Sequence, residues 1–347
     1  MAKVNLLTMH YTDNNGSFFQ TYATCRLLEE SGHSVTIINL QDRNWNRGRW
    51  RRGISYYKLL RYLRFEIARK RYYPPRTKLM FRVDTRLVPD ADYYVVGSDQ
   101  VWNWEITYYD YLSYFLAFVE KGKRVSLSSS MGIKWNVDKA QTERVKEELS
   151  KFSAVSVREK DMVDSCERLF GITPECLIDP TLAWGDYTIF LHKGKNRKHV
   201  GLYTYRSNGY APQIARSLGE LLGQCVNWTN ELPKKGFKSG RLFWEDPTDW
   251  INTINSSSVF VTDSFHGVAF SLILNIPFIA TVASKNKISR IESLLSIVGL
   301  ESRLVNSMDD FIARKDSLLA PIDWTFVNQR IEIEREKYKQ FIKNNIV

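Results

Sequence analysis

Residues 259–270 read VFVTDSFHGVAF, and this stretch decides the fold class. A short run of β-branched and aromatic residues stops at polar residues, a histidine and a glycine, and an apolar helical pattern follows. This order is typical of a strand that feeds a helix in an α/β domain. Because ligands of open α/β sheets bind at the carboxyl ends of strands, His266 occupies a position suited to a reactive histidine. A capped turn, with Asp263 or Ser264 as the helix N-cap, fits the same residues.

The length and composition indicate a globular protein of two domains. A chain of 347 residues exceeds one typical core, and roughly 150 residues per domain is the natural division. Hydrophobic residues make up 44% and charged residues 25%, which excludes a disordered chain. No apolar run reaches the roughly 20 residues of a membrane span, and the start MAKVNLLT turns polar too soon for a signal peptide. Four cysteines without C-x-x-C spacing predict reduced, buried thiols and a cytoplasmic protein: Cys25, Cys166, Cys176 and Cys225.

The positive charge is concentrated in residues 43–86. This segment holds 15 Lys and Arg against two acids, Glu66 and Asp84, so it carries +13; the chain's net +11 leaves about −2 for the remainder. It also holds nine aromatic residues. A basic, aromatic segment suits a polyanion, such as nucleic acid, or an anionic membrane surface. An ordinary helical insertion with a solvated cationic face explains the same composition.

Both halves of the chain alternate strands, polar loops and helices, which predicts parallel sheets. In the first half we expect strands at 3–9, 34–40, 92–96, 124–128, 154–157 and 177–178, and helices at 17–28, 54–71, 138–152 and 160–169. Ser17 is the expected N-cap of the first helix. The second half predicts strands at 199–205, 259–261 and 277–282, and helices at 211–222, 250–256, 289–298 and 328–343.

This pattern predicts two α/β domains with a cleft between them. The first spans residues 1–184 and includes 43–86 as a basic aromatic insertion. The second spans 185–325, and we expect the helix in 326–347 to pack back on the first domain.

Common catalytic motifs do not occur in the sequence. The five histidines, at 10, 33, 192, 199 and 266, show no metal-ligand spacing with a nearby carboxylate, so no metal site is predicted. No G-x-G-x-x-G, G-x-S-x-G or Walker A pattern is present, which argues against a dinucleotide site, a hydrolase elbow and a P-loop.

The remaining candidates are polar loops at predicted strand ends, two of which carry an arginine. Arg158 and Arg290 suit bidentate binding of a carboxylate or phosphate, and Lys285 adds a third cation. With one histidine and two helix N-termini, such loops suit a small dianion plus a polyol. For each arginine, a salt bridge to a neighbouring acid such as Glu159 or Glu292 is the alternative.

Five strings of residues, taken in order, resemble the polysaccharide pyruvyl transferase family. They are NNG at 14–16 with Gln20 and Tyr22, GSDQVWN at 97–103, SVRE at 156–159, DPT at 179–181 and TDSFHG at 262–267. The stretch 286–303 is also similar, with SRI at 289–291, and the likeness spans about residues 5–305. The basic segment 43–86 has no counterpart in this resemblance.

The resemblance implies two Rossmann-like domains in the GT-B-like architecture and a transferase that moves pyruvate from phosphoenolpyruvate onto a sugar as a ketal, releasing phosphate. It implies no tightly bound cofactor, since phosphoenolpyruvate is a substrate. By position in the motifs, His266 would carry protons, and Arg158 and Arg290 would hold the carboxylate and phosphate. Further substrate contacts are expected in both domains: Asn15, Gly16, Gln20, Ser98, Asp99, Gln100 and Asn103 in the first, and Ser264, Gly267 and Lys285 in the second.

We therefore expect an enzyme of exopolysaccharide or capsule synthesis whose acceptor is a sugar of a surface polysaccharide or of its lipid-linked precursor. The basic segment 43–86 would rest it on the inner face of the membrane. A nucleotide-sugar glycosyltransferase on the same architecture is the alternative, although no clear nucleotide clamp is visible. A third hypothesis is a non-catalytic protein that binds nucleic acid through the basic segment. This hypothesis does not explain the polar residues at the strand ends.

Overall fold

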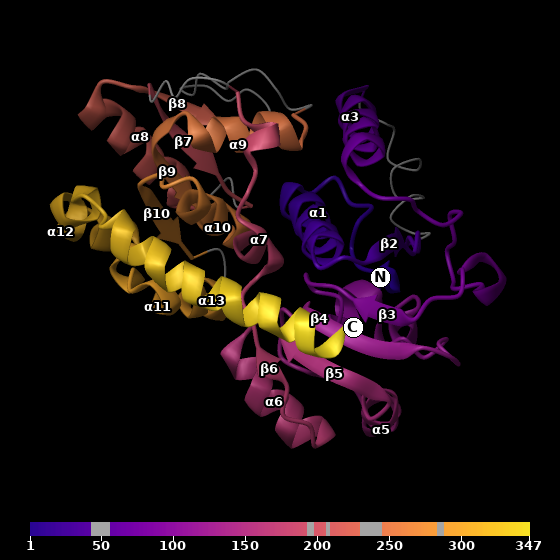
Figure 1. Cartoon of the computed structure of the whole chain (residues 1–347). Coiled ribbons are helices and arrows are strands. Elements are labelled where there is room, and N and C mark those ends of the chain that lie inside the picture. Colours follow the sequence, from indigo (N-terminus) through magenta and orange to yellow (C-terminus); the bar gives the residue numbers. More distant parts are fainter. Residues whose placement is uncertain (43–55, 193–197, 206–208, 230–244, 283–287) are drawn as a thin grey trace. The chain divides into compact units, whose positions relative to one another are not determined.

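The structure, a computed structural model, describes residues 1–42, 56–192, 198–205, 209–229, 245–282 and 288–347, and they form an α/β fold with two sheets (Figure 1). The chain divides into two compact units. Unit 1 contains Met1–Ser55, Arg69–Trp184 and Ile333–Val347, and unit 2 contains Tyr56–Ala68 and Gly185–Glu332. Each unit is built around one of the sheets.

Unit 1 has six strands in the order β2-β1-β3-β4-β5-β6, and every pairing is parallel. They are β1 (Lys3–Leu7), β2 (Ser34–Ile37), β3 (Tyr93–Val96), β4 (Lys123–Ser129), β5 (Phe152–Val157) and β6 (Glu175–Cys176). The central strands are nearly continuous buried runs, as expected for a parallel sheet that is covered on both faces. The sequence predicts all six strands, but β6 lies just before the predicted 177–178.

The helices of unit 1 follow its strands along the chain. They are α1 (Asn15–Glu30), α4 (Trp104–Thr107), α5 (Lys139–Leu149), α6 (Lys160–Phe170) and the short α7 (Pro180–Trp184). Asn14 is the N-cap of α1, because its side-chain oxygen accepts from the Ser17 amide at 3.1 Å. The prediction that Ser17 is the cap is therefore wrong: the Ser17 hydroxyl instead donates to the carbonyl of Met9.

Unit 2 has five parallel strands in the order β11-β10-β9-β7-β8. They are β7 (His199–Tyr203), β8 (Cys225–Trp228), β9 (Ser257–Thr262), β10 (Phe278–Thr281) and β11 (Leu304–Val305). Its helices include α8 (Ala211–Leu222), α9 (Pro247–Asn255), α10 (Phe265–Ile273), α11 (Ile288–Val298) and α12 (Met308–Leu319). The sequence analysis misses β8, β11 and α12.

Two helices contribute residues to both units. Helix α3 (Tyr56–Tyr72) counts with unit 2 up to Ala68, although the sequence analysis assigned all of 43–86 to the first domain. Helix α13 (Trp324–Asn345) counts with unit 1 from Ile333 onward. There the Nε of Arg335 donates to the Leu182 carbonyl at 2.8 Å.

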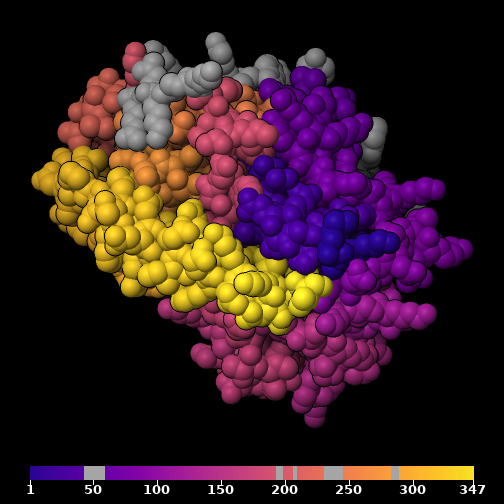
Figure 2. Space-filling model, in the orientation of Figure 1, coloured from indigo at the N-terminus to yellow at the C-terminus, as the bar shows by residue number. Residues whose placement is uncertain are grey.

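The two ends of the chain lie side by side in unit 1. The backbone amide of Val347 donates to the Tyr93 hydroxyl at 3.1 Å, and Met1, Ala2 and Val347 line the same surface pocket. Figure 2 shows the indigo N-terminus next to the yellow end of α13. Residues from the two ends of the sequence thus complete the amino-terminal edge of the unit 1 sheet.

The four cysteines differ in burial. Cys25 and Cys166 are buried and Cys176 is partly buried, but Cys225 is exposed, so the expectation of four buried thiols is wrong for Cys225. It stands first in β8, the outer strand at one end of the unit 2 sheet. None of the described helices is long and apolar enough to cross a membrane.

Candidate functional site

The predicted polar loops of unit 1 follow neighbouring parallel strands, so they lie at the same carboxyl edge of the sheet. The loop after β1 leads to Asn15, and the loop after β3 carries Ser98 to Asn103. Arg158 follows β5, and Asp179 follows β6. The structure therefore gathers at one edge the unit 1 motifs that are far apart in the sequence.

Arg158 is the centre of a buried charge cluster. Its Nε donates to Glu159 Oε1 at 2.9 Å, and its Nη1 donates to Asp179 Oδ2 at 2.6 Å. The Ser130 hydroxyl donates to the same Glu159 oxygen at 2.8 Å, and the Ser98 hydroxyl donates to Asp179 Oδ2 at 3.4 Å. Burial alone would lower the pKa of Arg158, but the two carboxylates raise it overall.

This cluster changes the role expected for Arg158. One guanidinium against two carboxylates leaves the cluster with excess negative charge, and Asp99 adds a further carboxylate to its electrostatic surroundings. The partners of Arg158 here are protein acids, which is the alternative that the sequence left open. A cluster with this charge balance is a poor place for a substrate trianion.

The loop after β3 is held by hydrogen bonds among its own side chains. Asp99 has a positive φ of 73°, and its Oδ1 accepts from the Gln100 amide at 2.9 Å. Gln100 Oε1 accepts from Asn103 Nδ2 at 2.8 Å, and Asn103 Oδ1 caps α4 by accepting from Glu105 N at 3.0 Å. Asn103 is buried, whereas Asp99 and Gln100 are half-buried, so these two are the members of the loop open to a ligand.

The start of α1 contains a buried amide with no partner in the described part of the chain. Neither the oxygen nor the nitrogen of the Asn15 side chain makes a hydrogen bond there, although both atoms are buried. Leaving such a group unpaired costs about 1–3 kcal/mol, which is a reason to expect a ligand or water at Asn15. Gly16, the next residue, is buried in the same helical turn.

The side chain of Gln20, by contrast, is buried and makes hydrogen bonds to other residues of unit 1. Its Nε2 donates to Thr8 Oγ1 at 3.0 Å and to Thr21 Oγ1 at 2.8 Å, and Thr8 in turn donates to the Ser98 carbonyl at 2.9 Å. These bonds tie α1 to the ends of β1 and β3. The structure thus gives Gln20 a positioning role, whereas the sequence analysis expected it to contact the substrate.

Arg69 is a positioning residue that the sequence analysis missed. It is fully buried, its Nε donates to the His10 carbonyl at 2.9 Å, and it lies 3.7 Å from Asp13. Arg69 therefore fixes the loop that leads from β1 to Asn15. Its position four residues after the buried Phe65 on α3 is the signal that could have identified it.

His10, in the same loop, is buried with both ring nitrogens bonded. Its Nδ1 lies 3.1 Å from the Thr8 carbonyl, and its Nε2 lies 2.9 Å from Asn39 Oδ1. Burial lowers the pKa of His10 from 6.5 to about 4. This histidine is therefore neutral at pH 7, and it is held by two partners inside the protein.

In unit 2, the opening stretch forms the end of β9 and the start of α10. Ser264 is the N-cap of α10, and its hydroxyl accepts from the Gly267 amide at 3.4 Å. Asp263 accepts from the Thr204 hydroxyl at 2.7 Å and from the Tyr205 amide at 2.8 Å, so it fastens the end of β7 to the end of β9. His266 lies in the first turn of α10 with 7% of its surface exposed.

Gly267 has a packing reason to be glycine. A Cβ at this position would lie 2.3 Å from Thr262 Oγ1 and 2.8 Å from Thr262 Cγ2. No larger residue fits unless the end of β9 moves. The close approach of α10 to β9 thus explains Gly267 without the substrate contact that the sequence analysis assigned to it.

Arg290 and Lys285 belong to the segment that follows β10. Arg290 lies in the first turn of α11 and is half-buried, and α11 packs against α10. Lys285 lies outside the described residues. Since β10 is the neighbour of β9 in the sheet, Arg290 and His266 both come from helices that follow adjacent strands.

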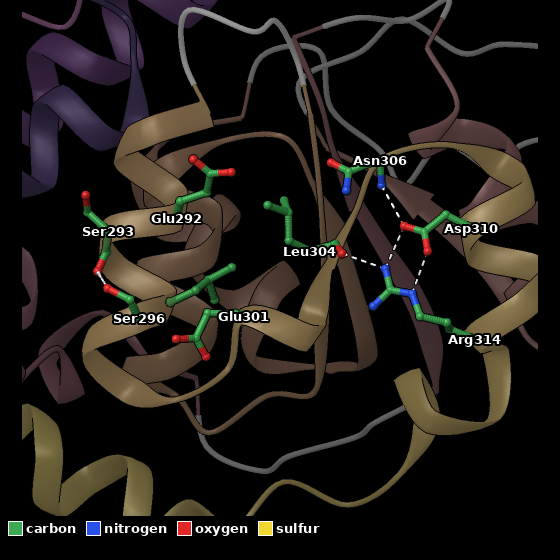
Figure 3. Close-up of a pocket in the computed structure, with 9 residues that line it drawn as sticks. Glu292, Ser293, Ser296, Glu301, Leu304, Asn306, Asp310 and Arg314 are labelled. Carbon is green, nitrogen blue, oxygen red and sulfur yellow. Dashed lines mark hydrogen bonds and ion pairs between the residues drawn. The ribbon is translucent and has the colours of Figure 1, made fainter.

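A cavity of about 720 Å³ lies elsewhere in unit 2, between α11, β11 and α12 (Figure 3). Its charged lining consists of three acids, Glu292, Glu301 and Asp310, and of Arg314, which is bonded to Asp310 at 2.6 Å. None of the predicted site residues lines it. Its net negative charge makes it unsuitable for an anionic substrate.

The described residues contain no group of three His, Cys, Asp or Glu side chains that could hold a metal ion. The candidate site residues that the structure describes lie instead at the carboxyl edges of the two sheets. The edge of unit 1 is rich in carboxylates and amides, and the edge of unit 2 carries His266, Arg290 and the start of α10.

Comparison with known proteins places the chain in a family and a fold. Residues 14–285 match the family model described as polysaccharide pyruvyl transferase. The structure of MnaA with UDP from S. aureus is similar with a TM-score of 0.53 and 12% identity, over 99% of this chain and 96% of that one. UGT89C1 from Arabidopsis thaliana, complexed with UDP-L-rhamnose, gives a TM-score of 0.50 and 9% identity over 98% of both chains. No curated protein matches the sequence.

At these identities the structural likeness concerns the fold alone. The chain has two Rossmann-like α/β domains of the GT-B type, as the sequence motifs predict.

Proposed function

The chain belongs to the polysaccharide pyruvyl transferase family, and is therefore a transferase, and we propose that it moves pyruvate from phosphoenolpyruvate onto a sugar as a ketal, releasing phosphate. The observation that carries the proposal is the position of His266. This histidine lies at the start of a capped helix, after the central strand of the unit 2 sheet, within the residues that match the family.

Phosphoenolpyruvate would bind at the carboxyl edge of unit 2. It is a compact trianion at most, so an arginine fork and the amide groups of a helix N-terminus are suitable ligands. Arg290 and the start of α10 supply these groups, and Lys285 is a further candidate. The nearby buried acid, Asp263, already accepts from Thr204 and Tyr205, which spreads its negative charge over two donors.

The sugar acceptor would bind at the carboxyl edge of unit 1. Sugar hydroxyls donate hydrogen bonds well to carboxylates and amide oxygens, and Asp99, Gln100 and Asn15 offer such oxygens. The excess negative charge around Arg158 favours a neutral polyol there over a trianion. Arg158 would then act as a positioning residue that holds Glu159 and Asp179, and through Asp179 the loop of Ser98.

In the proposed reaction His266 delivers a proton to the methylene carbon of phosphoenolpyruvate. The double bond supplies the electron pair for the new C–H bond, and a cation develops on the carbon that bears carboxylate and phosphate. One sugar hydroxyl adds there and loses its proton. Phosphate then leaves with its bonding electrons, and a second hydroxyl closes the ketal with loss of another proton. A histidine suits both giving and taking these protons near neutral pH.

The acceptor would be part of a surface polysaccharide or of its lipid-linked precursor. We propose a cytoplasmic enzyme, because both substrates would be available there. It would need no tightly bound cofactor, because phosphoenolpyruvate itself supplies the transferred group. A glycosyltransferase that uses a nucleotide sugar is the alternative on the same fold.

A single assay separates these functions. The protein is incubated with phosphoenolpyruvate and a panel of nitrophenyl and lipid-linked sugars, and in parallel with UDP-sugars and the same acceptors. We expect release of inorganic phosphate together with a mass gain of one pyruvyl ketal on one acceptor. Transfer from a UDP-sugar, with no consumption of phosphoenolpyruvate, would contradict the proposal.

A further inference from the structure

Helix α3, labelled in Figure 1, carries a row of exposed apolar side chains. Leu59, Leu63 and Ile67 are 38%, 45% and 65% exposed. Residues four apart lie on the same side of a helix, so the three form one stripe along α3. Exposed apolar residues are common when they are single, but a contiguous row needs an explanation.

The opposite side of the same helix is fixed to unit 2. Phe65 is fully buried, and Ala68 is buried one turn further on. The guanidinium of Arg64 lies 2.9 Å from Asp246 and 3.0 Å from Asp249, the two acids that form the capping box of α9. These contacts hold α3 in place, so the stripe cannot be buried by rotating the helix about its axis.

The charge around the stripe is positive. Lys70 and Arg71 are exposed and follow Ile67 by three and four residues, so they lie next to the carboxyl end of the stripe. Glu66 is the single acid in α3, and residues 43–86 as a whole carry 15 basic residues against two acids. An exposed apolar stripe beside cations is the pattern of a helix that lies in the interface of an anionic membrane.

We propose that α3 docks the enzyme on an anionic lipid surface, with Leu59, Leu63 and Ile67 inserted at the headgroup boundary and Lys70 and Arg71 on lipid phosphates. The purpose of this docking rests on the proposed function, because a lipid-linked acceptor lies at such a surface. A second copy of this chain is a poorer occupant, since two such basic helices repel each other. Nucleic acid would leave the apolar stripe in water.

The test is sedimentation of the full chain with vesicles of phosphatidylglycerol and phosphatidylcholine, compared with vesicles of phosphatidylcholine alone. We expect binding to the anionic vesicles that weakens as salt is added. The variant L63E/I67E should bind at least tenfold more weakly, because two apolar anchors become charged. The affinity of K70E/R71E for anionic vesicles should fall more than about fivefold for each cation that is removed.

The matched control is Ile312→Glu on α12, which changes an apolar side chain that is 62% exposed on a different helix of unit 2. It should bind like the wild type. Turnover with phosphoenolpyruvate and a soluble nitrophenyl sugar should be unchanged in L63E/I67E, which separates docking from catalysis. Failure of the proposed function would abolish this turnover in every variant and leave vesicle binding intact.

Three results would overturn the docking proposal. One is the absence of binding to anionic vesicles at low salt, and another is equal weakening by Ile312→Glu and by L63E/I67E. The third is a concentration-dependent dimer, measured by light scattering, that L63E/I67E converts to a monomer, since the stripe would then be an interface between copies.

Discussion

The carboxyl edges of the two sheets have the same construction but carry different charged residues. In unit 1 the edge holds Glu159 and Asp179 around one buried arginine, Arg158, whose Nε and Nη1 donate to these two acids. In unit 2 the edge holds His266 and Arg290, and its buried acid, Asp263, accepts two hydrogen bonds from the end of β7. Under the proposed function, the edge of unit 1 would bind the sugar hydroxyl groups and the edge of unit 2 would bind the anion that takes up a proton.

The difference shows that an arginine at a strand end is not by itself an anion site. Arg158 and Arg290 occupy comparable positions in the sequence, after parallel strands, and both were predicted to hold the substrate. Arg158 is bonded to both Glu159 and Asp179, whereas Arg290 lies in the first turn of α11. We therefore expect the charge balance of the whole edge, more than the residue type, to decide which substrate binds there.

The largest expected effect is that of His266→Ala. Loss of a general acid typically lowers kcat by about 10²- to 10⁴-fold, and we expect a loss in this range for pyruvyl transfer. Release of phosphate from phosphoenolpyruvate in the presence of acceptor measures it, with circular dichroism as the check on folding. Ser307→Ala, which removes the N-cap of α12, is the companion variant; it should cost about 1 kcal/mol of stability but retain activity. Near-normal turnover by His266→Ala would remove the proton-carrying role.

The two arginines should respond differently to the same substitution. Arg158→Met leaves two buried carboxylates without their counter-charge, and we expect it to lower the free energy of unfolding by about 3–5 kcal/mol. Arg290→Met should change it by less than about 1 kcal/mol, because a half-buried site at the start of a helix can be rehydrated. Urea unfolding of both variants measures this. If Arg158→Met were as stable as the wild type and bound phosphoenolpyruvate poorly, Arg158 would be a substrate ligand after all.

The pH dependence of stability should include a contribution from His10 in the loop after β1. Its pKa is 6.5 when unfolded and about 4 when folded, so the unfolded chain binds a proton below pH 6.5 that the folded protein does not take up until about pH 4. Stability should therefore fall as the pH drops through this window, by about 3 kcal/mol in total. Urea unfolding at pH 7 and pH 5 should show a smaller drop for His10→Asn than for the wild type. Equal drops would mean that His10 is not held neutral.

The smallest expected effect is that of Gly267→Ala. The added methyl group meets Thr262, and overpacking of this kind costs about 1–3 kcal/mol. Thermal unfolding measures the loss, and the double variant with Thr262→Ala should recover part of it because the closest atoms are removed. A variant with unchanged stability and a raised KM for phosphoenolpyruvate would instead support the role in substrate contact.

The sequence was sufficient to predict most strands and the loops that bear the candidate site. Buried strands of parallel sheets are apolar runs that end in polar residues, and this pattern locates His266, Asp99 and Arg158 at strand ends. The elements that the sequence analysis missed are either very short or lie in segments without a clear apolar period. Strand β11 has two residues, and α12 follows a serine cap in a segment of mixed polarity.

What the sequence could not predict is the set of partners that each side chain finds in space. Asp179 lies 21 residues after Arg158, and only the order of the strands brings the two together. Arg69 reads as one cation among many in a basic segment, yet it is buried against the loop after β1. Thr262 and Gly267 are five residues apart, and their contact depends on how closely α10 approaches β9.

The most direct test of the division between the two edges is a comparison of KM values for both substrates in Arg290→Met and Asp99→Asn. Asp99 and Arg290 are both partly exposed and lie at the carboxyl edges of different sheets, so each substitution changes one proposed binding group. We predict that Arg290→Met raises the KM for phosphoenolpyruvate about tenfold or more and leaves that of the sugar unchanged, while Asp99→Asn does the reverse. The opposite assignment, with Asp99→Asn affecting phosphoenolpyruvate alone and Arg290→Met affecting the sugar alone, would contradict it.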